Sequence, residues 1–230
     1  MHFEFASESG IIVYFSETIS QQAASSVAAA YAHLGAEKPG FICDLIPSYT
    51  SLLVIYDCTQ IDALGCMHWL KAELTSEVVD DRPELSSASF EIPVYYGPEV
   101  AFDLAEVSQQ TGLEESEVVR RHANGVYQVF AIGFAPGFAY LGLTEPCLRV
   151  DRKMTPRLKV PKGSVALADN QTAVYPSVSP GGWQVIGRTP IELVDWSSSA
   201  ISPFTIGGQV KFRAISRDEY LQLGGVFDGL

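Results

Sequence analysis

The stretch YQVFAIGFAPGFAYL, residues 127–141, decides the fold expected for this chain. An apolar run rich in aromatic and branched residues reaches a glycine, a proline and a second glycine, and another apolar run follows. Beyond residue 141, short runs of this kind recur about every ten residues, with glycine and proline between them. Short strands at so regular a spacing are typical of a β-barrel or a β-sandwich, so the C-terminal part is predicted to be mostly β.

The chain before residue 127 has a different texture, in which strand-like and helix-like runs alternate. Two short helices joined at Gly112 are predicted at residues 102–111 and 114–122. Further upstream the order is strand, helix, strand, strand, helix, strand, which is compatible with a ferredoxin-like fold. These six segments are residues 11–15, 16–35, 41–46, 51–58, 60–77 and a strand that starts at 90.

These patterns predict two domains. Residues 1–85 form a small α+β domain of ferredoxin-like order, and residues 86–230 form a mostly-β barrel domain. The polar segment 80–89 is the expected linker. Hydrophobic residues make up 47% of the 230 positions, which is enough to bury a sizeable core and argues against disorder.

The formal net charge of −12, from 15 basic and 27 acidic residues, argues against nucleic acid and anionic membranes as partners. Residues 104–122 do have the texture of a helix-turn-helix, with Gly112 at the turn. A DNA reader needs basic and amide side chains on its second helix, whereas this one begins with Glu114, Glu115 and Glu117. These carboxylates would repel the phosphates, so DNA binding is not expected.

The cysteines give no sign of a metal centre or of a disulfide framework. Cys43, Cys58, Cys66 and Cys147 show no CxxC spacing, and they are interpreted as small buried hydrophobes in a reducing compartment. The first ten residues lack the basic and apolar regions of a signal peptide. No apolar run reaches the roughly 18 residues of a membrane-spanning helix, so a soluble, cytoplasmic protein is expected.

Three clusters carry the residues best suited to chemistry. The first is HANGVYQVFAIGFAPGFAYL, residues 122–141. The second is TPRLKVPKGSV, residues 155–165, followed by DNQTAVYP, residues 169–176. The third is SPGGWQVIGRTP, residues 179–190.

Together these clusters resemble the KipI / allophanate hydrolase subunit 1 family, which is associated with the B subunit of 5-oxoprolinase. The likeness covers nearly the whole chain, because residues 46–56 (IPSYTSLLVIY) and 103–122 also look like the family. The chain departs from the family pattern at Lys162, where a small residue is common. It also departs at residues 168–170, where Ala-Asp-Asn replaces a turn that contains glycine.

The resemblance implies a cyclophilin-like barrel and one subunit of a heteromeric enzyme that uses ATP to open 5-oxo-L-proline to L-glutamate. It implies two partners: a related cyclophilin-like subunit of the C type and a third, hydrolase subunit of the A type. ATP with Mg²⁺ is expected to be shared with these partners, and no metal or prosthetic group is expected in this chain. No GxxxxGK[ST] motif occurs, so no P-loop binds ATP here.

Taken by themselves, the residues leave two interpretations open at each position. The loop around Phe134 and Phe138 forms aromatic walls for a small cyclic ligand, or a barrel corner that holds two core phenylalanines. Arg157 faces a carboxylate or phosphate, or it belongs to a solvated salt bridge. His122 ends an acidic helix, where it acts as an acid/base or simply favours the helix dipole.

The remaining candidates are amides and a turn. Gln171 and Gln184 suit the edge of a lactam, or they satisfy buried backbone groups. The turn at residues 180–183 offers backbone N–H groups that can cradle a phosphate, or it is a hairpin whose tryptophan closes the barrel end.

With the resemblance added, the predicted catalytic residues are His122 and Arg157. The predicted substrate-binding residues are Phe134, Pro136, Gly137, Phe138, Tyr140, Gln171, Gly181, Gly182, Trp183 and Gln184. Lactams are resonance-stabilised, and phosphorylation of the carbonyl oxygen turns it into a leaving group. Such chemistry needs positive charge near the phosphates and donors for the developing oxyanion.

A different function class is kept as the alternative, a binding module that inhibits a sensor histidine kinase, as the name KipI indicates. Such a module needs an exposed apolar patch for a helix bundle, whereas an enzyme subunit needs a polar, concave cleft. A stand-alone prolyl isomerase would rest on the analogy of the barrel fold alone.

Overall fold

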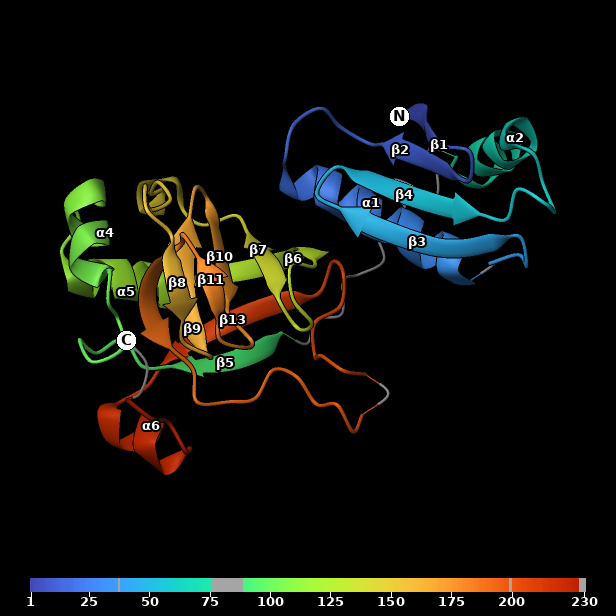
Figure 1. Cartoon of the computed structure of the whole chain (residues 1–230). Coiled ribbons are helices and arrows are strands. Elements are labelled where there is room, and N and C mark those ends of the chain that lie inside the picture. The colour runs from blue at the N-terminus through green and yellow to red at the C-terminus, as the bar shows by residue number, and fades with distance from the viewer. Residues whose placement is uncertain (37, 76–88, 199, 228–230) are drawn as a thin grey trace. The chain divides into compact units, whose positions relative to one another are not determined.

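The computed structural model describes residues 1–36, 38–75, 89–198 and 200–227. The chain divides into two compact units, Met1–Ser86 and Ser87–Leu230, each with a hydrophobic core of its own (Figure 1). The predicted boundary at residue 85 and nearly all of the predicted linker, residues 80–89, lie outside the described residues.

The first unit is an antiparallel sheet with the strand order β1-β2-β4-β3, against which two helices pack. Alternate residues of β4, Leu52, Val54 and Tyr56, are buried, and the residues between them are half-buried, as expected for a sheet with one face in a core. The elements are β1 (His2–Ser7), β2 (Gly10–Tyr14), α1 (Gln21–Ala36), β3 (Ile42–Ser48), β4 (Ser51–Tyr56) and α2 (Ala63–Glu73).

The ferredoxin-like order predicted for this unit is not confirmed. The predicted order contains no strand at residues 2–7, yet β1 forms one edge of the sheet as a hairpin with β2. The strand predicted from residue 90, β5 (Phe90–Val94), instead lies in the second unit. Closing a short hairpin costs little chain entropy, and this favours the local partner β1 over a strand far along the chain.

The second unit is built on a seven-stranded sheet with the order β12-β9-β10-β7-β6-β13-β5, in which β5 and β13 are parallel. A separate two-stranded sheet joins β8 and β11. The strands are β6 (Val126–Ile132), β7 (Ala139–Gly142), β8 (Arg157–Val160), β9 (Ser164–Ala168), β10 (Gln171–Val174), β11 (Ser179–Gly181), β12 (Gln184–Arg188) and β13 (Gln209–Ala214).

The two edges of this sheet meet, so the sheet is nearly closed into a barrel. Tyr95, directly after β5, and Arg188, the last residue of β12, exchange two backbone hydrogen bonds of 2.9 and 2.8 Å. The mostly-β barrel predicted for this part of the chain is therefore confirmed. The likeness to cyclophilin stays a prediction.

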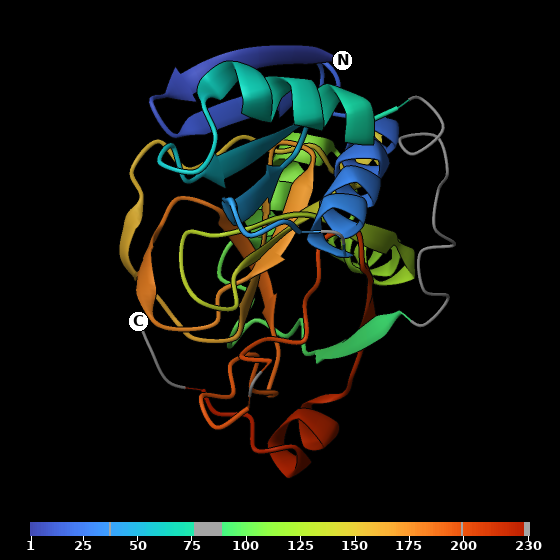
Figure 2. The same cartoon turned by 90° about the vertical axis from the view of Figure 1, so that its right-hand side faces the viewer.

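Helices cover parts of the second unit. They are α4 (Leu104–Thr111), α5 (Glu115–Asn124), a short 3₁₀ turn η1 (Pro146–Leu148) and α6 (Arg217–Gln222). α4 and α5 lie together, whereas α6 lies away from them (Figures 1 and 2). The predicted break at Gly112 is confirmed, since Gly112 has φ +71° and its N–H donates to the carbonyl of Ser108. Glycine adopts this left-handed conformation without steric cost.

Two expectations about composition can be compared with the described residues. The interpretation of all four cysteines as buried is wrong, because Cys43 and Cys58 are exposed, Cys147 is half-buried and Cys66 alone of the four is buried. Among the helices of the described residues, none combines the length and the hydropathy that a membrane span requires.

Candidate functional site

A pocket of about 220 Å³ opens in the second unit, where three loops that are distant in sequence meet. One loop joins β6 to β7, another precedes β8, and the third contains β11 and leads to β12. Its lining residues are Phe134, Phe138, Tyr140, Arg152, Lys153, Pro156, Tyr175, Pro180, Gly181, Gly182 and Trp183. All three predicted motif clusters therefore contribute residues to the pocket.

The loop between β6 and β7 supplies the aromatic wall. Phe138 is 2% exposed, and its ring meets those of Tyr175 and Trp183 edge-on, with centroids 5.4 and 6.0 Å away. Phe134, at the tip, is 62% exposed and has φ +73°. A Cβ at Gly137, which has φ +79°, would lie 2.5 Å from a methyl of Val194. The loop therefore needs glycine at this position in order to fold back against the barrel.

The turn that contains Gly181 and Gly182 forms the opposite wall. A Cβ at Gly181 would lie 2.3 Å from the hydroxyl oxygen of Tyr175, so only glycine allows this close approach. The carbonyl of Gly182 accepts a 2.7 Å hydrogen bond from the N–H of Lys153. This bond ties the glycine turn to the cationic segment that precedes β8.

Arg152 and Lys153 bring positive charge to the pocket. The Arg152 guanidinium lies 5.8 Å from the centre of the Trp183 ring, and its Nε is 3.5 Å from a carboxylate oxygen of Asp169. Lys153 Nζ donates to Asp103 at 2.9 Å and to Glu106 at 2.7 Å. Lys153 is therefore held by two short ionic hydrogen bonds, whereas Arg152 has one longer ion pair.

Asp103 is the centre of a buried ionic cluster behind the pocket. Its carboxylate is 2% exposed and accepts both branches of the Arg157 guanidinium at 2.7 and 2.6 Å, Lys153 Nζ, and the N–H of Val185 at 2.7 Å. Burial by itself raises the pKa of this carboxyl. The bonds from Arg157, Lys153 and Val185 outweigh that effect, and the net result is a lowered pKa. Asp103 is thus ionised and fixes two cationic side chains in place.

The predicted substrate-binding residues divide into two groups. Six of them line the pocket: Phe134, Phe138, Tyr140, Gly181, Gly182 and Trp183. Four are not among its lining residues: Pro136, Gly137, Gln171 and Gln184. Gln184 is fully buried and donates to Glu106 at 3.1 Å and to the carbonyl of Asp151 at 3.0 Å, while Gln171 is buried in β10. The two amides are thus groups of the protein interior rather than of the pocket.

The two predicted catalytic residues also lie outside the pocket lining. Arg157 is bound to Asp103, so we assign it a positioning role. His122 is fully buried in α5, with its Nδ1 2.8 Å from the Tyr96 hydroxyl and its Nε2 2.8 Å from the Thr172 hydroxyl. Its ring stacks on Phe212 at 4.5 Å. Burial lowers the pKa of His122 to about 3, so it is neutral at pH 7 and has no route to a ligand.

His122 is expected to make the stability of the protein depend on pH. Below about pH 6.5 the unfolded chain protonates this histidine, whereas the folded chain does not until about pH 3. The stabilisation by neutral His122 is therefore fully present above pH 6.5 and is lost as pH falls towards 3. The expected slope is about 1.4 kcal/mol per pH unit, measured as the free energy of unfolding in urea at pH 7.0, 6.0 and 5.0.

His122→Gln, which can still form hydrogen bonds but does not titrate, should lose this part of the slope. His68→Gln serves as the control, because His68 is exposed. An unchanged slope in His122→Gln would show that another group is responsible.

Arg152, Lys153 and Asp103 are the site residues that sequence reasoning did not single out. Arg152 and Lys153 lie just before the TPR motif, separated from it by Met154, and Asp103 is the second residue of the predicted helix of residues 102–111. The sequence contained only a weak signal for these residues. Asp103 stands near the start of a helix, and Arg152 and Lys153 precede a motif, and both positions are compatible with a binding site. The partner of Arg152, Asp169, lies 17 positions away, and the partners of Asp103 lie 50 to 82 positions away, which no local pattern reports.

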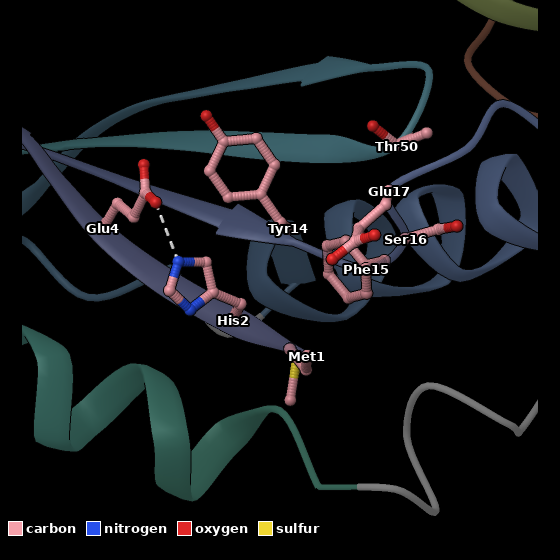
Figure 3. A pocket seen from close by; sticks show the side chains of 8 residues that line it. All are labelled: Met1, His2, Glu4, Tyr14, Phe15, Ser16, Glu17 and Thr50. Carbon is pink, nitrogen blue, oxygen red and sulfur yellow. Dashed lines mark hydrogen bonds and ion pairs between the residues drawn. The ribbon is translucent and has the colours of Figure 1, made fainter.

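A second pocket, of about 650 Å³, lies in the first unit (Figure 3). His2 and Glu4 point toward one another there and are joined by a 2.8 Å hydrogen bond, and Glu17 lies further along the lining. The carboxylates of Glu4 and Glu17 disfavour an anionic ligand, and the family resemblance implies such a ligand. The pocket of the second unit, with its two cations, is therefore the better candidate.

The described residues also offer nothing like a metal centre. Within the described ranges, no group of three or more His, Cys, Asp and Glu side chains gathers in a way that could hold a metal ion.

Comparison with known proteins agrees with this picture. A family model described as carboxyltransferase domain, subdomain C and D, matches residues 1–204. The chain is 37% identical over 223 residues to the 5-oxoprolinase B subunit of Bacillus subtilis (strain 168), covering 93% of this chain and 92% of that one. It is 47% identical over 154 residues to the 5-oxoprolinase B subunit of Escherichia coli O157:H7, covering 67% and 69%.

A solved structure extends the comparison to the fold. TTHA0988 superposes with a TM-score of 0.78 at 32% identity, over 90% of this chain but 40% of its own length. This chain thus spans less than half of TTHA0988. The match of the family model over most of the residues, and the near-full-length identity to the Bacillus protein, show that this chain belongs to the carboxyltransferase domain (subdomain C and D) family, together with the bacterial 5-oxoprolinase B subunits.

Proposed function

We propose that this chain is the B subunit of an ATP-dependent 5-oxoprolinase, which opens 5-oxo-L-proline to L-glutamate together with other subunits. The observation that carries this proposal is the 37% identity to the Bacillus 5-oxoprolinase B subunit across 93% of this chain. The pocket agrees with it, since aromatic walls and cations suit a small, flat, anionic ring. Nothing in these comparisons supports the alternative function, inhibition of a sensor histidine kinase.

The proposed substrate-binding residues are the six predicted residues that line the pocket, with Arg152 added. Pro136 and Gly137 shape the loop that carries Phe134 and Phe138. Arg157, together with Lys153, is placed by Asp103. Gln171, Gln184 and His122 support the barrel from inside. A cytoplasmic location remains a prediction.

The size of the pocket bears on where ATP binds. Pockets that enclose drug-sized ligands have volumes of about 300–1,000 Å³. The volume here, about 220 Å³, suits a five-membered ring and is too small for a whole nucleotide. Because a P-loop is also absent from the sequence, we propose that ATP and Mg²⁺ are held chiefly by the partner subunits. What this chain supplies is binding and orientation of the lactam.

An apolar rim around the pocket supports a partner that covers it. Phe134, Met154, Leu158 and Val178 are 62%, 102%, 87% and 59% exposed, and all lie on the segments that form or flank the pocket. Large apolar side chains gathered in this way mark interaction surfaces. We propose that the related cyclophilin-like subunit of the C type docks on this rim, and that the A-type hydrolase subunit completes the enzyme.

Reconstitution tests the proposed function. The purified chain alone is expected to release no glutamate from 5-oxo-L-proline, because the pocket of the second unit is too small for a nucleotide and the sequence contains no P-loop. Adding the two partner subunits and ATP with Mg²⁺ should restore glutamate release, measured in an enzyme-coupled assay. Turnover by the single chain, or no turnover by the reconstituted complex, would overturn the proposal.

The same preparation tests the rim. Leu158→Asp is expected to reduce co-elution with the C-type partner in size exclusion at micromolar concentration. Leu64→Asp is the matched control, because Leu64 is also exposed, at 63%, but lies on α2 of the first unit. Equal loss of co-elution in both variants would count against docking at the rim.

A further inference from the structure

We propose that Arg152 recognises the carboxylate of the substrate, with its guanidinium oriented by Trp183 and Asp169. This inference rests on the proposed function and adds the residue that distinguishes 5-oxo-L-proline from a lactam without a carboxylate. It makes Arg152 a specificity-determining residue of the pocket.

The charge balance around the pocket singles out Arg152. Lys153 and Arg157 are both bound to Asp103, and Lys153 also to Glu106, so two carboxylates neutralise two cations. Their side chains are 19% exposed. An anion that enters the pocket would have to compete with these short bonds to reach either cation. Neither one is therefore suited to be the main receptor for a ligand carboxylate.

Arg152 is held far more loosely and is accessible. Its side chain is 59% exposed, and its ion pair with Asp169 spans 3.5 Å between two side chains that are both half exposed or more. Exposed pairs of this kind contribute little free energy, at most about 1 kcal/mol. If a ligand replaces Asp169 as the partner of Arg152, the protein therefore loses little free energy of interaction.

The contacts of Arg152 do not use the edge of its guanidinium that is formed by Nη1 and Nη2, so this edge is available to a ligand. Asp169 approaches Nε, and the Trp183 ring lies 5.8 Å from the guanidinium carbon. A carboxylate binds arginine best through two parallel hydrogen bonds from one edge of the planar fork. With Nε facing Asp169, the edge formed by Nη1 and Nη2 is the one a ligand can use.

The position of Asp169 is fixed by the backbone. Asp169 has φ +53° in the turn between β9 and β10, and it exchanges backbone hydrogen bonds of 2.7 and 3.2 Å with Val150. Val150 is two residues before Arg152, so the same pair of segments carries both partners of the ion pair. Because these backbone hydrogen bonds hold Asp169 in place, its carboxylate can orient the Arg152 guanidinium.

Arg152→Gln is expected to raise the KM of the reconstituted enzyme for 5-oxo-L-proline by roughly 10- to 100-fold, the effect of losing hydrogen bonds to a charged group. The KM for ATP and the melting temperature should change little. Arg152→Lys should give an intermediate KM, because it keeps the charge but not the fork. Arg149→Gln is the matched control, an exposed arginine three residues away. The substrate analogue 2-pyrrolidone, which has no carboxylate, should bind wild type and Arg152→Gln equally weakly.

The outcomes separate this inference from the proposed function. If the wild-type complex turns over 5-oxo-L-proline and Arg152→Gln leaves its KM unchanged, the inference fails and the function stands. If the KM for ATP rises instead, Arg152 reads a phosphate, and the inference also fails. If the wild-type complex does not turn over at all, the function fails, and binding of 5-oxo-L-proline and 2-pyrrolidone to the full chain by NMR decides the matter. Binding of 5-oxo-L-proline that Arg152→Gln abolishes would support the inference, and equal or absent binding would overturn it.

Discussion

Replacing Asp103 with alanine is expected to destabilise the protein by about 3–5 kcal/mol and to remove most activity of the assembled enzyme. The carboxylate is 2% exposed and binds Arg157, Lys153 and the N–H of Val185. Truncation leaves two largely buried cations and a buried amide without their partner. The pocket wall formed by Lys153 then loses its anchor, so binding should weaken together with folding. Urea unfolding and kcat/KM of the complex measure the two effects.

Two further variants identify the cause. Asp103→Asn keeps the shape and one acceptor oxygen but loses the charge, so its effect should fall between wild type and Asp103→Ala. Glu192→Ala removes an exposed ion pair with Lys162 and should change the unfolding free energy by no more than about 1 kcal/mol. If Asp103→Ala behaved like Glu192→Ala, the cluster would have no special role.

Replacing Phe138 with alanine is expected to cost about 3–5 kcal/mol of stability and to lower activity as well. The ring is 2% exposed and packs edge-on against Phe134, Tyr140, Tyr175 and Trp183, with centroids 4.9 to 6.0 Å away. Its loss leaves a cavity in the floor of the pocket and releases the aromatic wall. Thermal unfolding followed by circular dichroism and the KM for 5-oxo-L-proline report the two consequences.

Phe134 provides the matched comparison for this prediction. It lies on the same loop but is 62% exposed, so Phe134→Ala should change stability by about 0.5 kcal/mol or less while still raising the KM. The pair thus separates a residue that is both core and wall from one that is wall only. Equal stability of the two variants would mean that Phe138 is not part of the core.

The sequence identified the aromatic and glycine loops because their requirements are local. Gly137 has φ +79°, a backbone conformation that glycine adopts without steric cost, and Phe134 and Phe138 flank the turn that it forms. Such constraints are written into a few consecutive residues. The same holds for the helix break at Gly112 and for the spacing of the short strands.

The charged residues show the opposite case. Arg157 lies within a motif and is therefore predicted from the sequence to be catalytic. In the structure its guanidinium is bound by the carboxylate of Asp103, 54 positions earlier. Arg152 carries no motif of its own, and its suitability follows from the weak partner that the β9–β10 turn provides. His122 has the same sequence environment whether it is exposed or buried, and only the packing of Tyr96, Thr172 and Phe212 makes it an interior residue.

By itself, the sequence determined the mostly-β barrel, the helix pair before it, the family and the aromatic loops of the pocket. The tertiary structure alone decided the pairing of β1 with β2, the place of β5 in the barrel, and which cations are neutralised. The physical reason is the range of the interactions. Backbone conformation and apolar periodicity are set by neighbours along the chain, whereas strand partners and ion pairs depend on which distant segments the fold brings together.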